Sequence, residues 1–167
     1  MLKEFKVFYG GTAATQQQLD AIQEIRVEQE VGHAWQATIT IPICIAEDGS
    51  WDGEHDAAYA EFARVRVEVR IGGGAFVPII DGRITGQDPG MSAEPGASTL
   101  TLTIQDDTTL LHREASAESF SGQSDSDIAR SVLGDAGLGG RIDVEDTGAT
   151  DSQAVVQRRG TSSFKIS

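Results

Sequence analysis

The residues best suited to chemistry lie in one acidic segment, Asp48–Asp56. Oxygen-bearing side chains occupy positions one, three and five of a calcium-binding loop, and Gly53 stands at position six, where such a loop turns sharply. Position twelve should be a glutamate that binds calcium through both oxygens, but it is Tyr59, and the pattern before the segment is that of a strand. We therefore favour a solvated acidic loop between two strands over a calcium site.

The usual catalytic signatures are not found in the sequence. No nucleophile elbow (G-x-S-x-G) and no phosphate-binding lysine is present. The glycine-rich segment Gly134–Gly140 follows a predicted helix, whereas a phosphate-binding loop must precede one. The histidines fall in segments of different kinds without metal-ligand spacing, and we interpret them as surface or turn residues: His33, His55 and His112. We predict no catalytic, cofactor-binding or metal-binding residue, and no enzymatic activity.

Composition excludes several classes of protein. The 167 residues include 26 acidic and 13 basic side chains, a formal charge of -13, so binding to nucleic acid or anionic lipid is not expected. No stretch approaches the roughly 18 consecutive apolar residues of a membrane-spanning helix. The single cysteine, Cys44, cannot form an intramolecular disulfide. This fits a reducing compartment and excludes a disulfide-rich secreted domain.

Most of the first two thirds of the sequence alternates apolar and polar residues, the pattern of half-buried strands. Pro42 has no N–H to donate, so it fits only a strand end or a sheet edge. Gly72–Gly74 predicts a tight reversal within a hairpin, and Asp88–Gly96 predicts a turn-rich connection. About six antiparallel strands are expected within residues 1–106: Phe5–Tyr9, Ile25–Val31, Trp35–Ile43, Arg64–Ile71, Phe76–Gln87 and Leu100–Ile104.

Such strands close into a barrel or pack as a sandwich, and alternation alone does not separate the two. In either case the apolar faces should form the core. Edge strands such as Phe5–Tyr9 suit strand addition between protomers. The predicted core residues are Trp35, Ile39, Ile41, Val65, Val67, Val69, Leu100, Leu102 and Ile104.

The pattern changes after residue 112. Ser124 can cap a helix, the acidic residues after it complement the helix dipole, and apolar residues follow at helical spacing. Gly137 stands where a left-handed C-terminal cap is expected. The sequence therefore predicts a helix over Asp125–Ala136, a short strand over Ala154–Arg158 and the start of another helix at Thr161–Ser163.

The second half of the sequence contains four short motifs whose types and order are similar to those of a known family. They are an apolar-x-Gly-x-Ile motif, a strand ending in Asp, a pair of leucines with basic residues and a Phe-x-x-x-Ser-Asp-x-x-Ile motif opening a helix: Ile80–Ile84, Leu100–Asp106, Leu110–Arg113 and Phe120–Ile128. This pattern is similar to the baseplate hub family, which comprises late-control protein D of contractile phage tails, the VgrG spikes of type VI secretion and the hubs of extracellular contractile injection systems. The resemblance covers about Arg64–Phe164.

The resemblance implies a mainly β fold with one or two helices. Residues 1–112 would form an antiparallel, tail-tube-like β-barrel, and residues 113–167 a helix-containing linker and the start of a second, incomplete domain. Family members continue further, so the chain resembles either a fragment or a shortened hub.

The same resemblance implies a structural hub subunit of a contractile phage tail or phage-like injection system, joining tail tube to spike. Its partners would be itself, as a homotrimer, the tail tube protein and the spike protein, without a cofactor, nucleic acid or membrane insertion. It would lie in a virion tail or phage-like injection particle assembled in the bacterial cytoplasm. The alternative is a stand-alone β-sandwich or barrel binding module with no injection role.

Overall fold

The computed structural model describes residues 3–31, 33–112, 117–138, 140, 142–148 and 155–158. The chain divides into two compact units, Met1–Asp106 and Asp107–Ser167. The described residues form mainly strands, with two α-helices and one 3-10 helix, so the predicted fold class is confirmed. No helix among these residues is long and apolar enough to cross a membrane.

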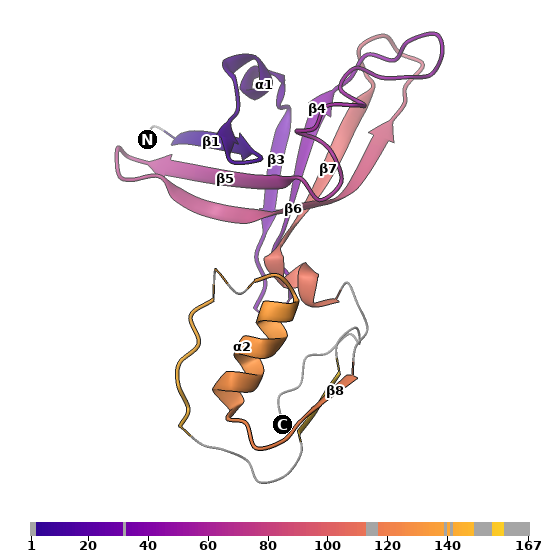
Figure 1. The fold of residues 1–167 in the computed structure, drawn as a ribbon. Helices are drawn as coiled ribbons and strands as arrows, with labels where there is room; N and C mark the ends of the chain where they lie inside the picture. The colour runs from indigo at the N-terminus through magenta and orange to yellow at the C-terminus, as the bar shows by residue number, and fades with distance from the viewer. Residues whose placement is uncertain are drawn as a thin grey trace. The chain divides into compact units, whose positions relative to one another are not determined.

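The first unit is a curled, seven-stranded antiparallel sheet with the order β2-β1-β5-β6-β7-β4-β3 (Figure 1). It is a half-barrel, because β2 and β1 lie at one edge, β3 lies at the other, and no pairing joins the two edges in the described part of the chain. The strands are β1 (Lys3–Tyr9), β2 (Thr12–Ala13), β3 (Glu24–Glu28), β4 (Gln36–Pro42), β5 (Arg64–Ile71), β6 (Val77–Gly90) and β7 (Thr99–Asp106).

Strand β6 carries two irregularities that favour the curl of the sheet. One register shift lies in its pairing with β5 beside Val67, and the other in its pairing with β7 beside Gly86; such bulges increase twist and curvature. Between them, a Cβ atom at Gly82 would lie 2.1 Å from the carbonyl oxygen of Gln105 on β7. The glycine of the apolar-x-Gly-x-Ile motif is therefore needed for the close approach of β6 to β7.

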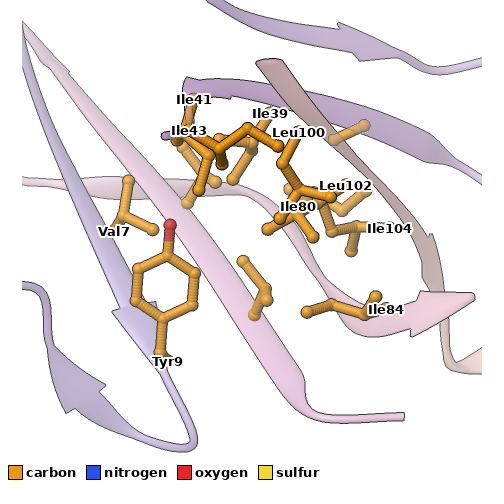
Figure 2. Close-up of a cluster of buried hydrophobic side chains, with 13 residues drawn as sticks. Val7, Tyr9, Ile39, Ile41, Ile43, Ile80, Ile84, Leu100, Leu102 and Ile104 are labelled. Carbon is orange, nitrogen blue, oxygen red and sulfur yellow. The ribbon is translucent and has the colours of Figure 1, made fainter. Parts of the chain in front are cut away.

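The core of the first unit lies on one face of the sheet, where apolar side chains of β1, β4, β5, β6 and β7 meet (Figure 2). Because side chains alternate along a strand, pairing brings apolar residues side by side: Ile39 lies opposite Leu102, and Val7 opposite Val67. Burial confirms most of the predicted core, namely Ile39, Ile41, Val65, Val67, Leu100, Leu102 and Ile104.

Two predicted core residues lie outside the core. Trp35 precedes β4 and is 43% exposed. Its N–H donates to Asp106 Oδ2 at 3.0 Å, and its carbonyl accepts from the Asp106 N–H at 3.0 Å. Hydrogen bonding between these two segments therefore continues past Ala37 and Ile104, the last apolar pair of β4 and β7. Val69 is only half-buried, because it lies toward the hairpin end of β5, past the residues that the core covers.

The hairpin between β5 and β6 is confirmed, with φ angles of 64° at Gly72 and 81° at Gly73. Strand β6, however, runs to Gly90, so the prediction of a turn beginning at Asp88 is wrong. Pairing of β6 with β5 reaches only to Arg83, whereas its pairing with β7 continues to the end. Pro89 therefore lies where β6 has a described strand partner on one side only, as a proline in a strand requires.

Helix α1 (Gln16–Ala21) is not predicted by the strand pattern. It begins at a capping box, in which the Thr15 hydroxyl accepts from the Gln18 N–H at 3.2 Å and Gln18 Oε1 accepts from the Thr15 N–H at 2.9 Å. Leu19 and Ile22 then pack against the core of the sheet. The Thr-x-x-Gln spacing was the signal that could have located this helix.

The second unit contains the 3-10 helix η1 (Asp107–His112), the antiparallel pair β8 (Ala117–Phe120) and β9 (Val155–Arg158), and helix α2 (Asp125–Asp135). Strand β9 confirms the short strand predicted over Ala154–Arg158, while the helix predicted at Thr161–Ser163 lies outside the described residues. A small cluster forms on one face of α2 from Phe120, Ile128, Val132 and Leu111.

Both ends of α2 follow the predicted capping pattern. The Ser124 hydroxyl accepts from the Asp127 N–H at 3.2 Å. At the other end, Gly137 has a φ of 80°, and the Leu138 N–H donates to the Leu133 carbonyl at 2.9 Å. This is the 6→1 bond of a Schellman motif, so the start of the glycine-rich segment serves as a helix cap.

Candidate interaction surface

The three histidines are placed in separate segments. His33 follows β3, is exposed, and has its Nδ1 atom 3.7 Å from Glu30 Oε2. His55 lies in the exposed loop between β4 and β5, and His112 ends η1. Within the described part of the chain, no group of three or more His, Cys, Asp or Glu side chains could hold a metal ion.

The acidic segment Asp48–Asp56 forms turns that its own carboxylates stabilise. Ser50 donates to Asp48 Oδ1 through its hydroxyl at 2.6 Å and its N–H at 3.0 Å, and these bonds lower the pKa of Asp48. Asp52 accepts from the Cys44 N–H, and Asp56 from the Ala58 N–H at 2.9 Å. The carboxylates thus bond to different backbone groups, as in a solvated loop.

The sequence pattern did not indicate a pair of tyrosines that joins the loop between β4 and β5 to the sheet. The rings of Tyr9 and Tyr59 are 5.5 Å apart in an edge-to-face arrangement. Burial raises the pKa of both phenols, and the charge of Asp56 raises that of Tyr59 further. Both phenols therefore stay protonated at neutral pH, when they can donate hydrogen bonds but are poor nucleophiles. The pair anchors the loop by packing.

An apolar groove with a volume of about 450 Å³ lies beside β1. Phe5 of β1 and Ile22–Ile25, whose last two residues begin β3, form its walls. Strands β5 and β6 contribute Val67, Val69 and Ile79. Glu4 and Arg70 also line it and form an ion pair with each other. The groove lies where the half-barrel is open, and no polar cluster suited to catalysis lines it.

Large apolar side chains are exposed at this end of the sheet. Phe5 is 45%, Ile71 53% and Val77 57% exposed, and they come from three strands that pair with one another, β1, β5 and β6. Such clustering of exposed apolar residues is typical of a contact surface. The residues belong to the predicted strands, but their exposure depends on where the core ends.

The edge of β1 beside the groove is open. Strand β2 pairs with β1 only at Phe8 and Tyr9, so no described strand pairs with the outer side of Lys3–Lys6. Strand β3 is the other edge and pairs only with β4 among the described strands. Unpaired strand edges can accept an additional strand, so both are candidate interaction sites.

The polar face of β1 and β5 is rich in cations, although the chain is acidic overall. Lys6 Nζ lies 4.1 Å from the ring centre of Phe76, and the Arg66 guanidinium lies 4.4 Å from that of Phe8. Arg70 also lies over Phe76, at 4.6 Å. Arg66 is also ion-paired with Glu68, and Arg70 with Glu4, so carboxylates of the same face offset part of this positive charge.

Comparisons with known proteins give a fold but not a family. No protein-family model matches the chain, and no curated protein matches it significantly. Two solved structures are similar. A tail protein from Neisseria meningitidis MC58 has a TM-score of 0.53 at 17% identity, over 81% of this chain and 34% of its own length. The 43 kDa tail protein of prophage MuSo2 from Shewanella oneidensis has a TM-score of 0.50 at 17% identity, over 80% of this chain and 39% of its own.

The chain spans less than two fifths of the length of either tail protein. At 17% identity the similarity establishes a shared fold. The chain therefore has a fold that is also found in part of a tail protein from a bacterial genome and of a prophage tail protein.

Proposed function

We propose that this chain is a structural subunit of a phage tail or of a phage-like contractile injection apparatus, and that it catalyses no reaction. The observation that carries the proposal is the fold, which is shared with two tail proteins over about four fifths of the chain. The groove and the open edges agree with this role, because they suit protein contacts rather than the binding of a reacting small molecule.

Within the tail, the proposed position is the baseplate hub that joins tube to spike. The four motifs of the hub resemblance support this position because each has a structural task here. Gly82 allows β6 to approach β7, and Leu102 is buried in the core of the first unit. Leu111 packs against the small core of the second unit, and Ser124 caps α2. We therefore expect another chain with the same motifs in the same order to use them for the same structural tasks.

The proposed partners are other copies of this chain, as a homotrimer, together with the tail tube and spike proteins. The proposed location is the virion tail or injection particle, assembled in the bacterial cytoplasm. A half-barrel with two open edges supports such an assembly, because strand edges and exposed apolar residues can be covered by neighbouring subunits.

Cross-linking of native particles tests the proposal. Particles purified from the source should contain the chain, and mass spectrometry of the cross-links should place it against tube and spike proteins. A chain recovered only as a free monomer, with particles intact without it, would reject the hub role in favour of an independent binding module.

A further inference from the structure

We propose that a groove between α1 and the loop joining β4 to β5 binds a basic side chain, arginine above all, of a partner protein. The groove lies in the first unit and has a volume of about 420 Å³. Neither edge strand of the sheet, β1 or β3, lines it. Three segments do, namely α1, the end of β4 and the loop, with Gln17 and Gln18, Ile41 and Ile43, and Asp52 and Asp56.

The lining combines apolar surface with carboxylates. At the end of β4, Pro42 is exposed between the buried side chains of Ile41 and Ile43 (Figure 2). The loop contributes Asp52 and Asp56, which are both exposed. Arginine and lysine have an apolar stem that packs on apolar surface and a charged end that stays near polar groups. A side chain of this kind matches both parts of the groove.

Each of the two carboxylates uses only one oxygen within the loop. Asp52 Oδ1 accepts from the Cys44 N–H, and Asp56 Oδ1 accepts from the Ala58 N–H at 2.9 Å. Among the described residues, neither carboxylate forms an ion pair. A cation that enters the groove therefore meets two negative charges that the chain itself has not neutralised.

The sequence around the groove is strongly acidic. Between Lys6 and Arg64 it has ten Asp and Glu residues and one basic residue, Arg26, which is ion-paired with Glu28 at 2.6 Å. A surface with such an excess of one charge attracts partners of the opposite charge and disfavours those of its own sign. The partner that we propose is therefore a protein with an exposed basic segment.

The groove is already formed in the single chain, because its loop is fixed to the sheet. The Tyr59 ring packs edge-to-face on Tyr9, and the Gln87 side chain donates to the Tyr59 carbonyl. Binding then costs little ordering of the loop. Arginine suits the groove better than lysine, because its planar guanidinium offers five N–H donors to carboxylates and is more weakly hydrated than an ammonium group.

A titration followed by nuclear magnetic resonance tests the groove on the full chain. The probe is the peptide acetyl-Gly-Arg-Gly-amide, and its control is the same peptide with citrulline, which has nearly the shape of arginine but no charge. The arginine peptide should shift the backbone amide signals of Gln17 and Gly53 in a saturable way. The citrulline peptide should bind at least tenfold more weakly, and equal binding of the two would overturn the proposal.

Substitutions in the loop locate the contact. Asp52→Asn and Asp56→Asn keep a side-chain oxygen for the Cys44 and Ala58 N–H groups, so the loop should keep its fold, which the unshifted amide signals of the sheet will verify. Each variant should weaken binding of the arginine peptide about three- to tenfold. The matched control is Glu47→Gln, which removes the same charge from an exposed residue of the same loop outside the groove.

Glu47→Gln should change binding less than twofold. Equal losses in all three variants would mean that general attraction to the acidic loop, rather than the groove, binds the peptide. Calcium chloride and sucrose are titrated in parallel. Saturable shifts of Gln17 and Gly53 with either, when the arginine peptide gives none, would assign the groove to a metal ion or to a sugar and would overturn the proposal.

This inference goes beyond the tail role and can fail separately from it. The titration uses the isolated chain, so an arginine peptide that does not bind rejects the groove and leaves the cross-links to tube and spike proteins as the test of the tail role. Conversely, a chain absent from native particles loses the tail role, while specific binding of the arginine peptide would still stand.

Discussion

Gly82 shows how a single residue controls the approach of two strands. Its missing side chain leaves room for the carbonyl oxygen of Gln105, which would lie 2.1 Å from a Cβ atom. We expect Gly82→Ala to lower the free energy of unfolding of the first unit by about 1–3 kcal/mol, because backbone rather than a flexible side chain must move. Denaturant unfolding followed by circular dichroism measures this change.

The same strand provides a control for that substitution. A Cβ atom at Gly86 would meet the Thr103 side chain at 3.6 Å, an ordinary contact distance. Gly86→Ala should therefore change stability much less than Gly82→Ala. If the two substitutions cost the same, the close approach of β6 and β7 at Gly82 is not what requires glycine.

The two faces of β7 give a second prediction at this scale. Leu102 is fully buried, whereas its neighbour Thr101 is partly exposed on the opposite face. Leu102→Ala should destabilise the unit by about 2–5 kcal/mol through lost burial and a residual cavity. Thr101→Ala should cost far less. Similar losses in urea unfolding for both variants would show that the register of β7 is wrong.

At the scale of elements, the strands could be predicted because each is long enough to show alternation. Strand β7 alternates over its whole length, and its three apolar residues are all fully buried. Helix α1, with six residues, is too short to show helical periodicity, and only its capping box marks it. Trp35 continued the alternation of β4, but alternation does not reveal where the core on that face ends.

Helix α2 gives a prediction that depends on pH. The Ser124 hydroxyl donates to Asp127 Oδ2 at 2.8 Å, and this bond, with a smaller contribution from the charge of Arg130, lowers the pKa of Asp127. A carboxyl whose folded pKa is depressed stabilises the fold above its unfolded pKa of about 3.9 and loses that contribution as pH falls through the folded pKa. The second unit should therefore lose stability in acid.

Substitution of the cap separates its two roles. Ser124→Ala should destabilise α2 by about 0.5–2 kcal/mol at neutral pH, because the Asp127 N–H loses its acceptor. It should also reduce the acid dependence that comes from Asp127. Amide hydrogen exchange in α2 at several pH values measures both effects, and an unchanged pH profile in Ser124→Ala would show that the Ser124 bond does not set this titration.

At the scale of the whole molecule, the groove and the open edges could not be predicted from local pattern. Strand β1 pairs with β5, some sixty positions later in the chain, and β3 reaches the other edge because β4 pairs with β7. Alternation specifies which face of each strand is apolar but not the order of the strands. The hub resemblance predicted an assembly role, yet the surfaces that would assemble emerge only from that order.

Net charge leads to the final prediction, on the salt dependence of self-association. Each copy carries a formal charge of -13, so copies repel one another over distances that salt screens. An exposed ion pair between two copies contributes only about 0–1 kcal/mol. Repulsion between whole molecules should therefore outweigh any ion pairs formed between copies, and apolar and backbone contacts should supply most of the attraction.

Association should consequently strengthen as salt increases from about 50 mM to about 500 mM, over which the screening length falls well below the size of the molecule. Sedimentation velocity at several salt concentrations measures the dissociation constant directly. Glu94→Lys changes an exposed residue in the loop between β6 and β7 and makes the net charge less negative, so it should flatten this dependence on salt. A dissociation constant that rises with salt would mean that paired charges, rather than apolar and backbone contacts, hold the copies together.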